Sequence, residues 1–261
     1  MSEPQRACRK HLCDPKGIPA HAGLLLAYGL TKHEKENVAR VKLLQSAQSA
    51  ARAATGIYER AFNRWVKDTP AGGGRAAAEV KTTDTGRLIT GLGSESVLET
   101  GLRLHYTYGT PLLPGSGLKG LAAHYAAAVW GEKDSKWKEH EEYHRVVFGT
   151  QDDAGHARFE DGWILPESLA TALQRDVMTP HHGDYYMADA ADDKTAPTDF
   201  DDPIPVAYLS VKGHFRVVVE WDAEQNAAGW AALVLGLVTE ALKNWGFGGK
   251  TSSGYGRMGM V

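Results

Sequence analysis

Apolar residues at helical spacing mark two long helices in this chain. The first occupies about residues 32–67, and we expect a break near Gly56. The second runs from Ala227 to Trp245, with Gly246 as its C-cap. The apolar stripe of the first is Val41, Leu44, Ala47, Ala51, Ala54, Tyr58, Ala61 and Trp65, and that of the second is Trp230, Leu233, Val234, Leu237, Val238, Ala241, Leu242 and Trp245.

Alternating apolar and polar residues predict β-strands between and after these helices. The clearest case is 205–221, which predicts two strands around Lys212-Gly213, with Phe215, Val217, Val219 and Trp221 on one side. The other segments that we expect to be strands are 87–90, 102–108, 145–148, 156–165 and 255–258.

A shorter helix follows the turn Pro114-Gly115, with Ser116 as N-cap and Leu118 on its apolar face. The element order is then strand, helix, two or more strands, helix, strand. This order predicts an α+β fold of the ferredoxin-like (RRM-like) type, an antiparallel sheet with helices on one face.

The Gly-rich segment Pro70–Arg75 divides the chain. We expect residues 1–75 to be an N-terminal helical extension with its linker, and residues 76–261 to be the ferredoxin-like domain, with inserted loops around 132–205. The acidic, Pro-containing stretch 189–202 predicts an exposed loop or hairpin.

Composition narrows the class of protein. The 261 residues are 43% hydrophobic and 23% charged, which is typical of a soluble globular chain. The start of the chain lacks the apolar core of a signal peptide and no run could span a bilayer, so we expect a cytoplasmic protein. A net charge of −3 means that any polyanion must bind in a local basic groove.

The C-terminal end carries the strongest chemical signal. Residues 246–256 contain five glycines around Lys250, and such a backbone can turn several N–H groups toward one anion. Gly249-Lys250-Thr251 matches the end of a nucleotide-binding P-loop, but Asn244 stands where that motif begins with glycine. A helix precedes the segment and no long helix follows it, so we exclude an ATP site.

Two residue clusters suggest metal ligands only weakly. Cys8, His11 and Cys13 lie close together with His21 beyond them, but a structural zinc site takes four ligands, and we expect two reduced thiols. A polar stretch holds the other cluster: His181, His182, Asp184 and Asp189. We predict no metal and no cofactor.

Taken together, the motifs resemble the RAMP superfamily of CRISPR proteins. The resemblance rests on the Gly-rich segment from Trp245 to Gly256 and on the Pro-Gly-Ser-Gly-Leu-Lys-Gly helix start at 114–120. Within the superfamily, Thr179–Tyr186 (Thr-Pro-His-x-x-x-Tyr-Tyr) and the helical lead look like a RAMP subunit of the type III-B (Cmr) effector complex. The likeness extends over nearly the whole chain.

The resemblance implies a non-catalytic RNA-binding subunit in antiviral defence. It would contact the backbone of the guide RNA (crRNA) near its 3′ end and the guide–target duplex, in a complex with other Cmr-type RAMP subunits and a small helical subunit. The residues expected to bind RNA are Gly246, Phe247, Gly248, Gly249, Lys250, Thr251, Ser252, Ser253, Gly254, Tyr255, Ser116, Gly117, Lys119 and His181.

Three alternatives stay open. Relatives that cleave target RNA use an aspartate in the loop after the first strand, and the corresponding loop 91–101 has Glu95 and Glu99 instead. Guide-processing relatives use histidine, for which His105, His124, His181 and His182 are candidates. The third alternative is an architectural subunit whose loops touch only protein.

Overall fold

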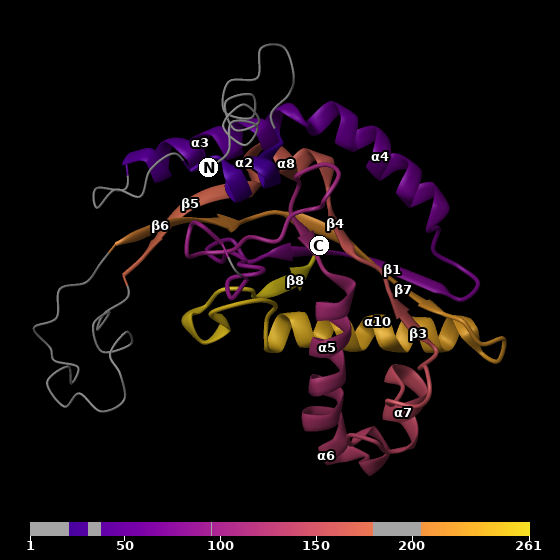
Figure 1. Cartoon of the computed structure of the whole chain (residues 1–261). Coiled ribbons are helices and arrows are strands. Elements are labelled where there is room, and N and C mark those ends of the chain that lie inside the picture. Colours follow the sequence, from indigo (N-terminus) through magenta and orange to yellow (C-terminus); the bar gives the residue numbers. More distant parts are fainter. Residues whose placement is uncertain (1–20, 31–37, 95, 180–204) are drawn as a thin grey trace, which may run out of the picture.

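The computed structural model describes residues 21–30, 38–94, 96–179 and 205–261 (Figure 1). The helices are α2 (Ala22–Tyr28), α3 (Val38–Ala53), α4 (Thr55–Asp68), α5 (Gly115–Tyr125), α6 (Gly131–Lys133), α7 (Glu142–Phe148), α8 (Pro166–Ala172) and α10 (Ala227–Asn244). The strands are β1 (Arg75–Thr82), β2 (Leu112–Leu113), β3 (Ala157–Phe159), β4 (Gly162–Ile164), β5 (Leu173–Met178), β6 (Val206–Val211), β7 (His214–Trp221) and β8 (Met258–Met260).

An antiparallel sheet forms the centre, in the order β2-β4-β7-β1-β8, with β3 also paired to β7. Strand β7 is the central strand of this sheet. It pairs with β1 from Arg75↔Glu220 to Lys81↔His214 on one side and with β3 and β4 on the other. The predicted apolar side of β7 is buried, and so is Val218 on the opposite side. Both faces of the sheet are therefore covered.

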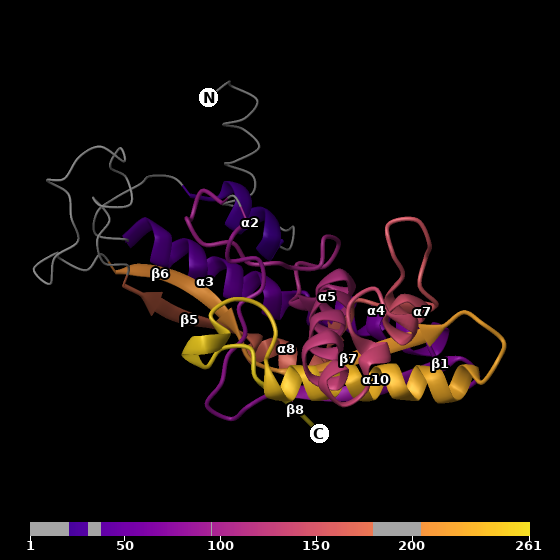
Figure 2. The same cartoon turned by 90° about the horizontal axis from the view of Figure 1, so that it is seen from below.

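Helices α5 and α10 lie together on one face of the sheet, as Figures 1 and 2 both show. Along the chain, β1, α5, β3–β4, β7, α10 and β8 follow one another, and the last strand lies beside the first. This arrangement confirms the expected α+β, ferredoxin-like fold. Helix α10 ends at Asn244, close to the predicted residue, because Gly246 then turns the backbone with φ +82.

The N-terminal helices cover the opposite side of the sheet, where α3 and α4 arch over it in Figure 1. They are one interrupted helix whose break at Ala54 lies near the predicted Gly56. Trp163 of β4 joins α4 to the sheet, since its ring stacks on Trp65 at 5.1 Å and on Tyr58 at 5.7 Å. The division of the chain near residue 75 stays a prediction.

Several predicted elements are wrong. Segments 87–90 and 102–108 make only isolated bridges, such as Leu88↔Val211 and Leu104↔Pro111, and the first strand is instead β1, whose Ala-rich start has weak strand propensity. The predicted strand 145–148 is the end of helix α7, because a short apolar run fits either structure. The last strand is β8, three residues later than its predicted start.

A second sheet consists of β5 and β6, paired in register from Leu173↔Val211 to Met178↔Val206. It projects from the main sheet as a hairpin, and β6 leads directly into β7 through Lys212-Gly213 (Figure 1). Within the described residues, no helix is long and apolar enough to cross a membrane.

Tyr58→Phe tests how firmly α4 holds the sheet. The buried Tyr58 hydroxyl donates a hydrogen bond of 2.7 Å to the carbonyl oxygen of Ile164. Losing it should lower the free energy of unfolding by about 1 kcal/mol, measured by urea denaturation. Tyr28→Phe, on a side chain that is 63% exposed, is the matched control and should change nothing. Equal stabilities of all three proteins would contradict the role given to Tyr58.

Candidate functional site

The Gly-rich loop, residues 246–256, folds back against the segment Arg87–Thr90. Gly249 N–H donates to Ile89 O at 2.8 Å, and Gly256 N–H donates to Arg87 O at 2.7 Å. The loop also closes on itself, since Phe247 N–H donates to Gly256 O at 2.9 Å. Backbone hydrogen bonds at both ends thus fix the loop to a neighbouring segment far away in sequence.

Glycine is required where the loop approaches that segment. At Gly248 (φ +86) a Cβ atom would lie 2.1 Å from Ile89 O, and at Gly256 (φ +77) it would lie 2.0 Å from Phe247 O. Neither distance is compatible with a side chain. The glycines therefore serve the internal packing of the loop as well as any approach of a ligand.

The outer surface of the loop is polar and offers backbone donors. Lys250 has φ +57, and the next three residues form a 3-10 turn with exposed Ser252 and Ser253. Within the described chain, the N–H groups of Lys250, Thr251 and Ser252 make no hydrogen bond. A left-handed residue followed by right-handed ones turns successive N–H groups to one side, the geometry of an anion-binding nest.

The loop and the start of α5 together border a groove of about 410 Å³. Gly117 permits their contact, since a Cβ atom there would lie 2.8 Å from the Phe247 ring. The groove is lined by Thr90, Gly91, Pro114, Gly117, Leu121, Trp245, Gly246, Phe247, Gly248 and Thr251. The two motifs singled out in the sequence, 130 residues apart, thus meet in space.

The start of α5 differs from its prediction. The N-cap is Pro114 and not Ser116, which lies in the first turn. The side chain of Asp161, from the β3–β4 turn, accepts the Gly115 N–H at 2.7 Å. A carboxylate thus already occupies part of the predicted anion site at this helix start. The N–H groups of Ser116 and Gly117 belong to the first turn and, as in any helix, have no intrahelical acceptor.

Lys119 lies away from the groove. It follows Gly117 by two residues, which is a turn of about 200° around the helix. Leu121 and His124, four and seven residues after Gly117, lie on the groove side instead, and the groove lining includes Leu121. Neither predicted lysine lines the groove, but Lys250 directly precedes Thr251, which does, and is therefore the better placed of the two.

The two predicted aromatic residues face inward. Phe247 is buried beneath the loop, and the Tyr255 hydroxyl is hydrogen-bonded to Asp176 and Tyr208. The half-buried aromatic ring in the groove lining is that of Trp245, which meets His124 edge-on at 5.1 Å. The sequence pattern placed Trp245 in the apolar stripe of α10, and it was not predicted as a site residue. Its position directly before Gly246, the first residue of the loop, could have indicated that it lies at the site.

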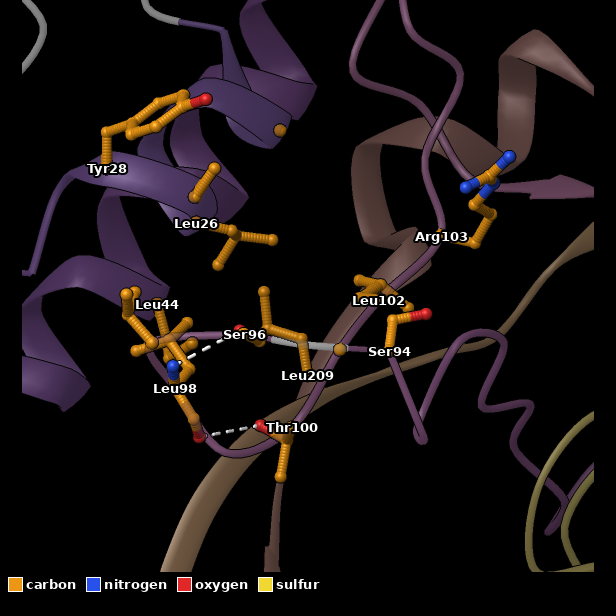
Figure 3. Close-up of a pocket in the computed structure, with 14 residues that line it drawn as sticks. Leu26, Tyr28, Leu44, Ser94, Ser96, Leu98, Thr100, Leu102, Arg103 and Leu209 are labelled. Carbon is orange, nitrogen blue, oxygen red and sulfur yellow. Dashed lines mark hydrogen bonds between the residues drawn. The ribbon is translucent and has the colours of Figure 1, made fainter.

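The loop 91–101 opens on a different hollow, of about 750 Å³, between α2, α3 and β6 (Figure 3). Leu26, Leu44 and Leu209 lie around it, with Tyr28 at one rim and Arg103 at another. Its described lining includes no carboxylate. Glu99 has φ +59 and forms an ion pair of 3.2 Å with Arg40, while Glu95 lies outside the described residues.

The other candidate histidines and metal ligands do not join the groove in the described chain. His105 packs edge-on against Trp163 at 4.8 Å under α4, and burial lowers its pKa. His21 caps α2, its Nδ1 accepting the Leu24 N–H. His181, His182, Asp184, Asp189, Cys8, His11 and Cys13 lie outside the described residues, which contain no group of three metal-ligating side chains.

Comparisons with known proteins agree on one family. The profile of the RAMP superfamily matches residues 82–259. The CRISPR system Cmr subunit Cmr6 of Pyrococcus furiosus is 30% identical in an alignment covering 66% of this chain and 64% of that protein. The chain thus spans slightly less than two thirds of this relative's length.

Two solved structures are also similar. The crystal structure of Cmr6 from Pyrococcus furiosus is 28% identical, with 72% of this chain and 97% of that chain covered and a TM-score of 0.42. A chain in the cryo-EM structure of the type III-B Cmr-beta bound to cognate target RNA is 16% identical, with 98% and 86% covered and a TM-score of 0.56. The second likeness supports the fold.

Valine substitutions at three glycines separate the effects of space and backbone conformation. Gly248→Val should lower the free energy of unfolding by about 3 kcal/mol or more, because steric overlap adds to the cost of a positive φ. Gly254→Val meets open space at φ +88 and should cost about 1–2 kcal/mol. Gly93→Val, with neither constraint, is the control. Chemical denaturation should rank them in this order; equal effects at 248 and 254 would refute the close approach.

Proposed function

This chain belongs to the RAMP superfamily, and we propose that it is a non-catalytic, RNA-binding subunit of a type III-B CRISPR ribonucleoprotein effector. Its partners would be the guide RNA, contacted near the 3′ end, the paired target RNA, neighbouring Cmr-type RAMP subunits and a small helical subunit. Cytoplasmic antiviral defence would be its setting. The likeness to Cmr6 and to a chain of an RNA-bound Cmr complex supports this proposal.

The outer surface of the Gly-rich loop is the observation that carries the proposal. Three consecutive N–H groups without an acceptor among the described residues, an exposed lysine and two exposed serines offer donors to an RNA phosphate or a 2′-hydroxyl. Such contacts hold a backbone in position and carry no base code. They suit a protein that must accept guides of any sequence.

The groove beside the loop extends this surface toward α5. Gly117 and the N–H groups of the first turn of α5 lie on its other wall, with Ser116 exposed next to them. Because Asp161 is already bound to Gly115 N–H, we assign the phosphate contacts mainly to the loop. Lys119 and His181 remain expected RNA contacts, although Lys119 does not line the groove and His181 lies outside the described residues.

Two separate observations support the proposal of a non-catalytic role. The described lining of the 750 Å³ hollow beside loop 91–101 holds no acid, and the Glu99 carboxylate is engaged by Arg40. His124 packs edge-on against Trp245 of the groove lining, and an indole ring cannot activate it as a base. A RAMP endoribonuclease that processes guide RNA or cleaves target RNA is the alternative.

Substitution of Lys250 tests the RNA contact. Lys250→Gly removes the charge and suits φ +57, so RNA affinity should fall about three- to tenfold while stability is kept or rises. The loss should be similar for every sequence, and the slope of log K against log salt should become shallower by about 0.7. Fluorescence anisotropy with labelled single-stranded RNAs measures both.

Two further variants serve as controls for Lys250. Lys250→Arg keeps the charge and should bind normally, and Lys42→Ala changes an exposed lysine of α3 on the opposite side of the sheet. A loss of affinity that depends on RNA sequence, or unchanged RNA binding by Lys250→Gly, would contradict the proposal that Lys250 contacts the RNA backbone. Absence of ultraviolet cross-links from RNA to residues 246–256 would favour a purely architectural subunit.

Combined substitution of the remaining acid and base candidates tests the enzymatic alternative. Glu95→Gln with Glu99→Gln, and separately His124→Ala, should leave cleavage of target RNA by the reconstituted complex and processing of its guide at the wild-type rate. A group acting in general acid–base catalysis would cost about a hundredfold or more when removed. A loss of that size with intact assembly would assign an endoribonuclease activity to this subunit.

A further inference from the structure

A chain of hydroxyl groups ties the Gly-rich loop to the hairpin formed by β5 and β6. The Tyr208 hydroxyl donates to the Tyr255 hydroxyl at 2.7 Å, and Tyr255 donates to Asp176 Oδ2 at 2.8 Å. Tyr208 and Asp176 face each other as a register pair of β6 and β5. Residues of two separate parts of the fold thus share one polar network.

Asp176 is the acceptor on which this network ends. Its Oδ2 also accepts the Ser210 hydroxyl at 3.2 Å and forms an ion pair of 3.1 Å with Arg87. Burial raises the pKa of both Tyr208 and Tyr255 further above neutral pH. Both protonated phenols donate within the network. Hydrogen bonds in such a chain, with a charged acceptor at its end, strengthen one another.

Backbone hydrogen bonds connect Tyr255 to the outer surface of the loop. Tyr255 N–H donates to the carbonyl oxygen of Lys250 at 3.3 Å, and Gly256 N–H donates to that of Arg87. Lys250, with φ +57, is the first of the three residues whose N–H groups have no acceptor in the part of the chain that the structure describes. Fixing the Tyr255 side chain therefore fixes the turn that presents the lysine and its amides.

We propose that Asp176, Tyr208 and Tyr255 are positioning residues that latch the Gly-rich loop onto the β5–β6 hairpin and hold Lys250 in its RNA-binding conformation. The inference rests on the proposed function and changes the expected role of Tyr255. Its ring does not stack on a base; its hydroxyl orders the loop from within. Tyr208, which is 2% exposed, acts without touching RNA.

Phenylalanine substitutions test the latch, because they remove the hydroxyl and keep the ring. In the full-length chain, Tyr255→Phe should weaken binding of labelled single-stranded RNA about three- to tenfold, and Tyr208→Phe should weaken it less, since Tyr255 can still reach Asp176. Tyr106→Phe, on a side chain that is 94% exposed, is the control. Urea denaturation of each variant checks that it is folded under the binding conditions.

A double-mutant cycle with Lys250 separates positioning from general stability. If the latch acts by holding Lys250, Tyr255→Phe should lower affinity less in the Lys250→Gly background than in the wild-type chain, because only the amides and serines of the turn can then be misplaced. Additive losses would overturn the latch, as would wild-type binding by both phenylalanine variants. Wild-type binding by Tyr255→Phe together with weak binding by Tyr255→Leu would assign stacking to the ring instead.

The same experiment distinguishes failure of the latch from failure of the RNA-binding proposal. If Lys250→Gly weakens binding and Tyr255→Phe does not, the latch is refuted and the RNA contact stands. If neither variant weakens binding, the loop has no role in RNA binding and both proposals fall.

Discussion

The close backbone contact between the Gly-rich loop and the segment Arg87–Thr90 is the constraint on which the candidate site depends. Two carbonyl groups of that segment, those of Arg87 and Ile89, accept N–H groups from opposite ends of the loop. The same segment is bound to β6 by reciprocal hydrogen bonds between Leu88 and Val211. One short extended segment thus lies between the loop and the hairpin, and its carbonyls leave room only for glycine at Gly248.

This contact explains why the loop can display unpaired donors on one side. The N–H groups of Phe247, Gly249 and Gly256 are satisfied by neighbouring carbonyls, and the Phe247 ring is buried beneath the loop. The N–H groups of residues 250–252, which have no acceptor among the described residues, can therefore face outward without distorting the turn. The chain as a whole carries a net charge of −3, which disfavours anions. A small surface of fixed amide dipoles with one lysine nevertheless offers a local site for an anion.

Sequence reasoning found the parts of the fold that have strong periodicity and missed those decided by tertiary contacts. Helix α10 and strands β6 and β7 follow directly from their apolar patterns, and both predicted motifs do meet in space. Strand β1 has no such signal in Ala76–Ala78 and exists because β7 pairs with it along its whole length. The carboxylate at the start of α5 comes from Asp161, 46 residues away, and no local pattern reveals it. The position of Lys119, in contrast, was predictable from the sequence, because residues two apart in a helix point in nearly opposite directions and Lys119 could not share the side of Gly117.

At Lys250, the residue types that best suit the backbone conformation differ from those that supply a positive charge. A residue at φ +57 with a Cβ atom is held at a cost of about 1–2 kcal/mol, and glycine, asparagine and aspartate are the replacements that relieve it. None of these three carries a positive charge. A substitution that relaxes the backbone at this position therefore also removes the positive charge from the turn.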